Sequence, residues 1–173
     1  SPRAQMTNAK GNEVIPMASG SERTRERKRY SELIKYIKGK GMEVGIRPLL
    51  FVVDSVGKTP VEETLPDGTK KVWWHGNIQP KDPDKWFESF KAYLDLYLNI
   101  AKAEHVEHFT LAAELYSMTV GIEDQWAEHP HGFPKQWLNL LRYTKSKLGP
   151  EIKIHYDINF TDDRVDTDNT ARF

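Results

Sequence analysis

The chain contains no cysteine in its 173 residues, which excludes disulfide bonds and thiolate metal sites. This absence does not fix the compartment, since secreted proteins need not carry disulfides, and an extracellular location stays open. No apolar run is long enough to cross a membrane. The 25 basic residues balance the 25 acidic ones, so no overall field attracts nucleic acid or an anionic membrane. We therefore expect neither nucleic acid nor a membrane as a partner.

Phosphate-binding and metal-binding motifs are missing as well. Neither G-x-G-x-x-G nor G-x-x-x-x-G-K-[ST] follows a predicted strand, which weakens the hypothesis of an open-sheet nucleotide-binding protein. His105 and His108 stand close together in the sequence, but at a helix-to-strand junction and without further ligands. The acidic segment 166–169 lacks the glycine and the distal glutamate of a calcium loop. We expect no cofactor and no metal ion.

What the sequence does contain is an alternation of strand-like and helix-like segments. The predicted elements are the end of a helix in residues 1–12, a short strand at 13–17, a charged helix at 23–40, a strand at 42–47, a hairpin at 59–74, a helix at 85–104, a strand at 109–113, a helix at 134–148 and a strand at 152–158. Repeated βα units predict a parallel sheet with right-handed crossovers. Such a sheet can stay open and doubly wound, or it can close into a barrel.

Elaborate loops after the predicted strands favour the barrel, because such loops gather at the carboxyl ends of strands in (β/α)8 TIM barrels. A complete barrel needs roughly 200 to 400 residues, and this chain shows only about four strands. We therefore predict an α/β fold, an incomplete piece of a (β/α)8 TIM barrel covering about its second to fifth strands. Residues 1–173 are expected to form one partial barrel domain with an inserted hairpin loop at 55–82. The remaining strands would come from a longer chain or from another subunit.

The candidate chemistry centres on Glu114. The apolar run 109–113 ends abruptly at this acid, as expected of a strand that is buried on both faces and stops at a functional edge. A partly desolvated carboxylate at the carboxyl end of a strand suits a general acid. The alternative is a solvated glutamate that begins a loop.

Two other segments are expected to bring side chains to the same edge. Pro48 cannot donate to a sheet, so the regular strand should stop near Arg47, with 49–54 running extended over the rim. Arg47 would then contact a substrate or form an ion pair in the barrel mouth. After the hairpin come Trp73 and Trp74. We expect one ring to pack and the other to form a platform for a sugar, with a hydrophobic plug under the hairpin as the alternative.

Four segments share the pattern of a known family. They are G-M-E-V-G-I-R-P at 41–48, W-H-G-N-I at 74–78 leading into the helix at 85–104, F-T-L-A-A-E-L at 109–115, and 137–159 ending in Y-D-I-N. Together they resemble glycoside hydrolase family 113, the β-mannanase-like members of the clan A (β/α)8 glycosidases. The resemblance covers most of residues 11–160.

The resemblance implies a retaining glycosidase that cleaves mannan or a related polysaccharide. The family's acid/base glutamate ends the fourth strand, which corresponds to Glu114, and its nucleophile glutamate ends a seventh strand that this sequence is not expected to reach. Ala113 stands where many clan A enzymes place asparagine, so a contact to the sugar 2-hydroxyl from this position is in doubt. The residues expected to contact an oligo- or polysaccharide are Arg47, Asp54, Trp74, His75, Tyr116, Trp126 and Asn159. The alternative is a non-catalytic carbohydrate-binding or structural barrel module of a larger assembly.

Overall fold

The structure, a computed structural model, describes residues 2–120 and 126–158. Its strands are β1 (Arg3–Met6), β2 (Ile15–Pro16), β3 (Gly45–Ile46), β4 (Leu49–Val52), β5 (Val61–Thr64), β6 (Lys70–Trp73), β7 (His108–Ala113) and β8 (Lys153–Asp157). Its helices are α1 (Gly20–Lys38), α2 (Pro83–Ala103), α3 (Tyr116–Thr119) and α4 (Pro134–Leu148), with the 3-10 helix η1 (His75–Asn77). None of the helices in these residues combines the length and hydropathy needed to cross a membrane.

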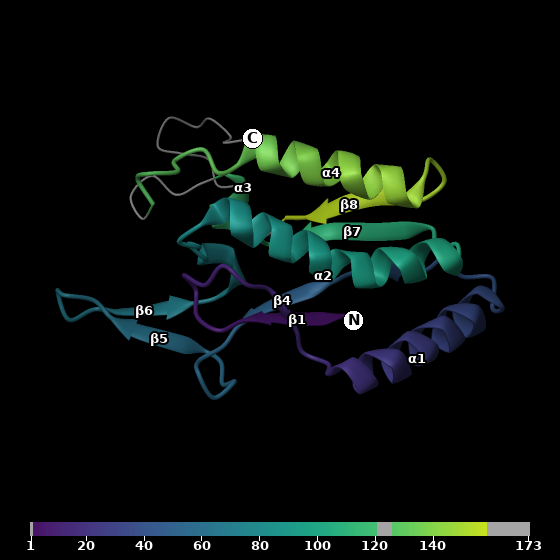
Figure 1. The fold of residues 1–173 in the computed structure, drawn as a ribbon, viewed down its shortest axis with the longest axis horizontal. Coiled ribbons are helices and arrows are strands. Elements are labelled where there is room, and N and C mark those ends of the chain that lie inside the picture. Colours follow the sequence, from purple (N-terminus) through teal and green to yellow (C-terminus); the bar gives the residue numbers. More distant parts are fainter. Residues whose placement is uncertain (1, 121–125, 159–173) are drawn as a thin grey trace.

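The strand pairing outside the hairpin is mostly parallel, as the βα order predicts. β1 pairs in parallel with β4, β3 pairs in parallel with β7, and β7 pairs in parallel with β8. β2 pairs antiparallel with the other edge of β1. Across the described ranges these strands form two three-stranded sheets, in the orders β2-β1-β4 and β3-β7-β8, and not a closed barrel. The α/β class is thus confirmed, and Figure 1 shows the β5–β6 hairpin projecting beyond the end of β4.

One sequence prediction about strands is wrong and another is incomplete. Residues 1–12 were expected to end a helix, yet residues 3–6 form β1, where Ala4 and Met6 are fully buried and alternate with more exposed neighbours. The helix-favouring residue types of this segment are overridden by pairing with β4. The expected stop near Arg47 is confirmed, since β3 ends at Ile46. Residues 49–54, however, were expected only to run extended over the rim, whereas 49–52 form the paired strand β4. Pro48 removes one donor, and the chain changes its partner there, from β7 before the proline to β1 after it.

The three long predicted helices are present as α1, α2 and α4, although α1 begins at Gly20, three residues before its expected start, and α3 was not predicted. Ser19 and Glu22 form a capping box at the start of α1. The Asp82 side chain accepts from the backbone N–H of Lys85 at the start of α2, and Pro134 occupies the first position of α4. The predicted hairpin is present as β5 and β6.

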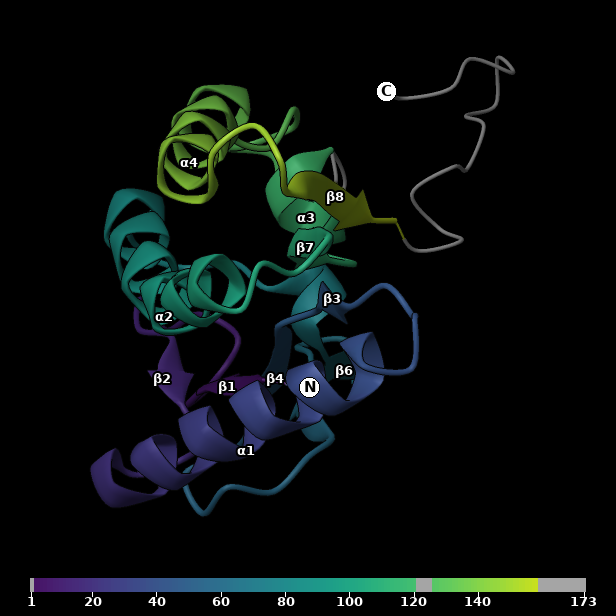
Figure 2. The same cartoon turned by 90° about the vertical axis from the view of Figure 1, so that its right-hand side faces the viewer.

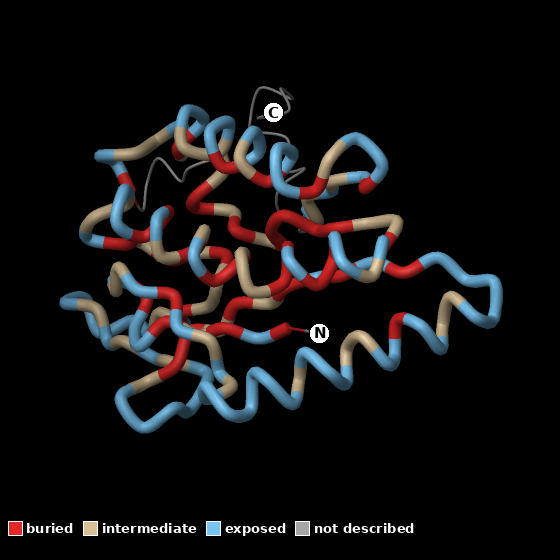
Figure 3. Tube along the Cα trace, turned by 45° about the vertical axis from the view of Figure 1, so that its right-hand side comes forward, coloured by how far each residue is buried: buried red, intermediate tan, exposed pale blue. Residues whose placement is uncertain are grey.

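The core lies between the sheet and the helices α2 and α4, which run side by side along β7 and β8 (Figure 2). Phe87 of α2 packs edge-on against Trp137 of α4, with ring centroids 5.2 Å apart. Burial is concentrated in the sheet and α2, whereas α1 is mostly exposed and buries only Ile34 (Figure 3). The strand β7 is buried from Phe109 to its end, so the residue that follows it leaves from a well-packed position.

Candidate active site

Glu114 follows β7 in an unusual backbone conformation. Its φ is +57°, in the left-handed region that residues other than glycine rarely adopt. Its backbone N–H donates to the carbonyl of Asp157, at 2.8 Å. The chain therefore turns sharply where the parallel strand ends, and the surrounding packing holds the strain. Strained residues of this kind cluster at functional sites.

His75 contacts the Glu114 carboxylate. Nε2 of His75 lies 3.1 Å from Oε2 of Glu114. Because an ionised carboxylate only accepts hydrogen bonds, the imidazole N–H is the donor when Glu114 is charged. The side chains are 26% and 32% exposed respectively, so both are sheltered yet reachable from solvent.

The turn that carries His75 is fixed from both sides. The Asn77 side chain accepts from the N–H of Trp74 at 2.9 Å and donates to the carbonyl of Val72 at 3.0 Å. The buried hydroxyl of Ser117, in α3, donates to the carbonyl of Ile78 at 2.5 Å. This last bond ties the turn after the hairpin to the helix directly after Glu114. The turn at 74–78 and helix α3 are therefore packed together, and this packing places His75 beside Glu114.

The two neighbouring tryptophans have different environments, as the sequence predicts. Trp73 is buried, and its Nε1 donates to Glu63 at 2.7 Å. Burial lowers the pKa of Lys71, whose ammonium group lies 4.0 Å from the centre of the Trp73 ring. Trp74 is half-buried and meets the ring of His75 edge-on. Its ring also lies so close to Gly76 that a Cβ there would come within 2.3 Å of it, so a larger residue would force the Trp74 ring to move.

Arg47 forms an ion pair at the carboxyl end of β8, with Nε 2.5 Å from Oδ2 of Asp157. Arg47 directly follows the end of β3, as predicted, and its side chain reaches the level of Glu114, whose N–H donates to the Asp157 carbonyl. The role of Asp157 was missed from the sequence. The same rule that indicated Glu114, a carboxylate at the end of a predicted parallel strand, also describes Asp157.

The remaining predicted contact residues lie in different surroundings. Asp54 follows β4, and its Oδ1 accepts from the N–H groups of Val56 and Lys58, so it closes its own turn. Tyr116 begins α3, two residues after Glu114, and is half-buried. Trp126 is buried against Phe133, with ring centroids 5.4 Å apart. Asn159 lies outside the described residues.

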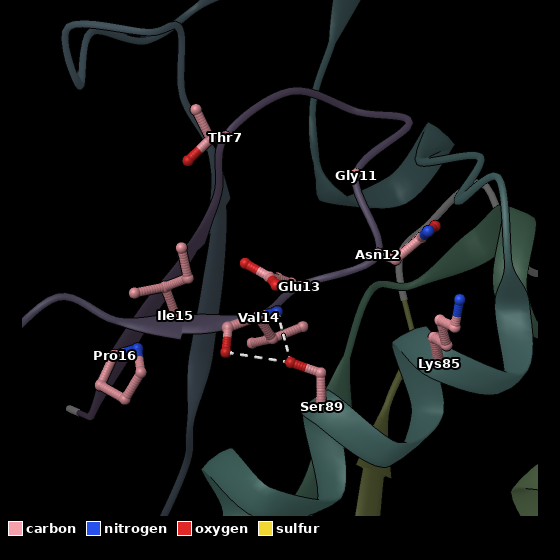
Figure 4. A pocket seen from close by; sticks show the side chains of 9 residues that line it. All are labelled: Thr7, Gly11, Asn12, Glu13, Val14, Ile15, Pro16, Lys85 and Ser89. Atoms are coloured by element: carbon pink, nitrogen blue, oxygen red, sulfur yellow. Dashed lines mark hydrogen bonds between the residues drawn. The ribbon is translucent and has the colours of Figure 1, made fainter.

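Within residues 2–120 and 126–158, no group of three His, Asp or Glu side chains is placed to hold a metal ion. A groove between the segment 7–16 and the start of α2 includes Glu13 and Lys85 among its lining residues (Figure 4). There the Ser89 hydroxyl is occupied by the backbone N–H and carbonyl of Val14. This groove does not include Glu114 or His75 and holds no comparable pair of acid and imidazole.

Comparisons with known proteins define the class. The profile of Glycoside Hydrolase Family 113 matches residues 4–160, so the chain belongs to this family. The resemblance inferred from the sequence segments is thereby confirmed. No curated protein matches the chain.

Solved structures show the same fold. The GH113 β-mannanase AaManA from Alicyclobacillus acidocaldarius, in complex with ManMIm, is similar with a TM-score of 0.62 at 14% identity, covering 93% of this chain and 43% of that one. A GH113 β-1,4-mannanase is similar with a TM-score of 0.60 at 20% identity, covering 94% and 45%. A complex of a GH113 β-1,4-mannanase gives a TM-score of 0.59 at 20% identity, covering 94% and 44%. The chain thus spans less than half the length of these TIM-barrel relatives.

Proposed function

We propose that Glu114 is the acid/base of a retaining glycosidase that cleaves mannan or a related β-linked polysaccharide. The observation that carries the proposal is the His75–Glu114 contact at the carboxyl end of β7, on a residue with left-handed backbone. In TIM barrels this end of the strands carries the chemistry. The family and the mannanase neighbours support the substrate class.

In this proposal Glu114 first acts as an acid. A second carboxylate, about 5 to 5.5 Å away, attacks the anomeric carbon while Glu114 gives its proton to the departing glycosidic oxygen. The C–O bond to the leaving sugar breaks and a glycosyl ester forms. Glu114 then takes a proton from water, whose oxygen displaces the ester and releases the sugar with its original configuration. We assign no nucleophile within the described residues, and the rest of the barrel, from a longer chain or another subunit, would supply it.

Two neighbours of Glu114 have roles in this scheme. His75 engages only Oε2 through the contact described above, which orients the carboxyl group. Trp74 offers a partly exposed ring beside His75, and such rings stack on the apolar faces of sugars. Arg47 and Asp157 border the same edge.

A non-catalytic carbohydrate-binding barrel is the second candidate. The observation that favours it is Ala113, a buried methyl group directly before Glu114, where many clan A glycosidases have asparagine. An enzyme of this type uses hydrogen bonds to the sugar 2-hydroxyl to stabilise the transition state. A binding module has no such need.

The deciding experiment uses the natural full-length protein with β-1,4-mannan and mannooligosaccharides. We expect release of reducing ends with retained anomeric configuration, measured by proton NMR, and a loss of at least about 100-fold in Glu114→Gln. Glu107→Gln is the matched control, because Glu107 sits at the opposite end of the same strand. Glycan binding without turnover would favour the binding module, and inversion of configuration would exclude the retaining mechanism.

A further inference from the structure

The turn at Glu114 is held by two consecutive residues of β8. The N–H of Glu114 donates to the backbone carbonyl of Asp157, and the N–H of Leu115 donates to the side-chain hydroxyl of Tyr156, at 3.0 Å. The ladder between β7 and β8 ends at the pair Ala113 and Asp157. The N–H of Leu115 therefore lies beyond the backbone hydrogen bonds of this strand pair. The Tyr156 hydroxyl accepts its hydrogen bond instead of a strand carbonyl.

The Tyr156 ring is held in a position from which its hydroxyl can accept the hydrogen bond from the Leu115 N–H. It packs edge-on against Trp137 of α4, with ring centroids 6.0 Å apart. The β7–β8 register shifts between Thr110 and Ala112, so Tyr156 aligns with Ala112. A shift of this kind changes which side chains reach the end of the strand.

The same hydroxyl lies near the helix that follows Glu114. Oγ1 of Thr119 lies 3.5 Å from the Tyr156 hydroxyl and donates to the carbonyl of Leu115 at 3.1 Å. Helix α3 in turn holds the His75 turn through Ser117 and Ile78. Tyr156 is thus in contact with both the backbone next to the acid and the helix that positions its imidazole partner.

We propose that Tyr156 is a positioning residue: its hydroxyl fixes the Glu114–Leu115 turn and so keeps the Glu114 carboxylate against His75. As an effect on catalysis, the inference rests on the proposed function of Glu114. The geometric part, the dependence of the His75–Glu114 contact on Tyr156, stands without it. Loss of the hydroxyl leaves the Leu115 N–H without its acceptor, and the strained conformation of Glu114 loses one of its two supports.

The test compares Tyr156→Phe with Tyr143→Phe in the natural full-length protein. Tyr143 also uses its hydroxyl, which donates to Asp95 at 2.5 Å, but between α4 and α2 and away from the site. With mannohexaose as the probe, we expect Tyr156→Phe to lower kcat roughly tenfold with KM changed less than about twofold. The ¹⁵N shift of His75 Nε2 should move in Tyr156→Phe and stay unchanged in Tyr143→Phe.

The two readouts separate the two proposals. A wild-type protein without turnover, in which the His75 signal still depends on Tyr156, would reject the hydrolase and keep the positioning role. An unchanged His75 signal in Tyr156→Phe would overturn the positioning role whatever the activity. A loss of thermal stability equal in both variants, with kcat equally unaffected, would also overturn it by reducing Tyr156 to a structural residue.

Discussion

The two ends of β7 carry two glutamates that are almost equally exposed and yet differently engaged. At the amino end, Glu107 is 30% exposed; Oε1 lies 2.7 Å from Lys38 Nζ, and Oε2 accepts from the N–H of Val44 at 2.8 Å. At the carboxyl end, Glu114 is 32% exposed and its Oε2 meets His75 at 3.1 Å. The comparison teaches that partners, and not exposure, distinguish a structural acid from a candidate catalytic one.

The histidines repeat the same contrast. At the amino end, His108 uses both ring nitrogens, Nε2 toward Glu43 and Nδ1 toward Nε2 of His155, each at 2.8 Å. This series of contacts joins His108 of β7 to His155 of β8 and to Glu43, and it leaves His108 no ring nitrogen for another ligand. At the carboxyl end, His75 meets the acid that begins a loop. The described contacts at the amino end of β7 thus join neighbouring segments to one another, and this end of the strands usually contributes to stability in barrels.

The largest expected difference between the ends concerns the leaving group. Glu114→Ala should lower kcat/KM on mannooligosaccharides by about 1,000-fold, because a sugar leaving group needs the proton. A dinitrophenyl mannooligosaccharide, whose leaving group departs as an anion, should lose far less in the first step. Initial rates on both substrates, with Glu107→Ala as the control, measure this difference. Equal losses on the two substrates would remove Glu114 from the acid role.

The second difference concerns the histidines. His75→Gln should lower kcat roughly tenfold, because the carboxylate loses the donor that orients it. His155→Gln removes a ring from the amino-end chain and should leave kcat within about twofold. Steady-state kinetics on mannohexaose check both variants. A loss of kcat in His155→Gln as large as that in His75→Gln would contradict the assignment of catalysis to the carboxyl end of the strands alone.

Sequence reasoning found elements whose signals are local. Asp82 and Pro134 each specify a helix start within a few residues. β1 was missed because its four residues depend on pairing with β4, more than 40 residues away. Short strands with helix-favouring residues have no local signal that competes with their propensity.

The candidate site shows the same limit. The strand-end rule indicates Glu114 from the sequence alone, because burial followed by an acid is a local pattern. Its contact with His75 is not local, since it depends on the bond between Ser117 and Ile78, 39 residues apart. The hydrogen bond from Leu115 to Tyr156 likewise spans 41 residues. Such contacts follow from packing, which a single sequence does not reveal.

The third difference is one of stability. The hydrogen bond with Lys38, and then that from the Val44 N–H, lower the pKa of Glu107 below its ordinary 4.5. A folded-state pKa below the unfolded value stabilises the protein above pH about 4.5, and this stabilisation is lost as pH falls through the folded value. Glu107→Gln should therefore cost about 1 kcal/mol at neutral pH, since water screens this partly exposed pair.

Urea unfolding of wild type and Glu107→Gln at pH 7 and pH 3 measures that difference. The gap in free energy of unfolding should shrink at the lower pH, where the wild-type carboxylate is being protonated. Comparing the difference between the two proteins cancels the other acids that titrate in this range. A gap that stays constant with pH would mean that the charge of Glu107 contributes nothing.

The smallest expected effect lies at the carboxyl end, in the Arg47–Asp157 pair. The side chains are 44% and 35% exposed, so Arg47→Met should cost only about 0.5 kcal/mol, and less in 1 M salt, where exposed charges are screened. Unfolding at low and high salt measures this, and titration calorimetry with mannohexaose measures affinity in parallel. Because the Arg47 guanidinium is paired with Asp157 at the end of β8, we expect the affinity to change less than about threefold. A tenfold loss of affinity with unchanged stability would instead show that Arg47 contacts the substrate. The carboxyl end of the strands would then present both a cation, Arg47, and an acid, Glu114, to the ligand.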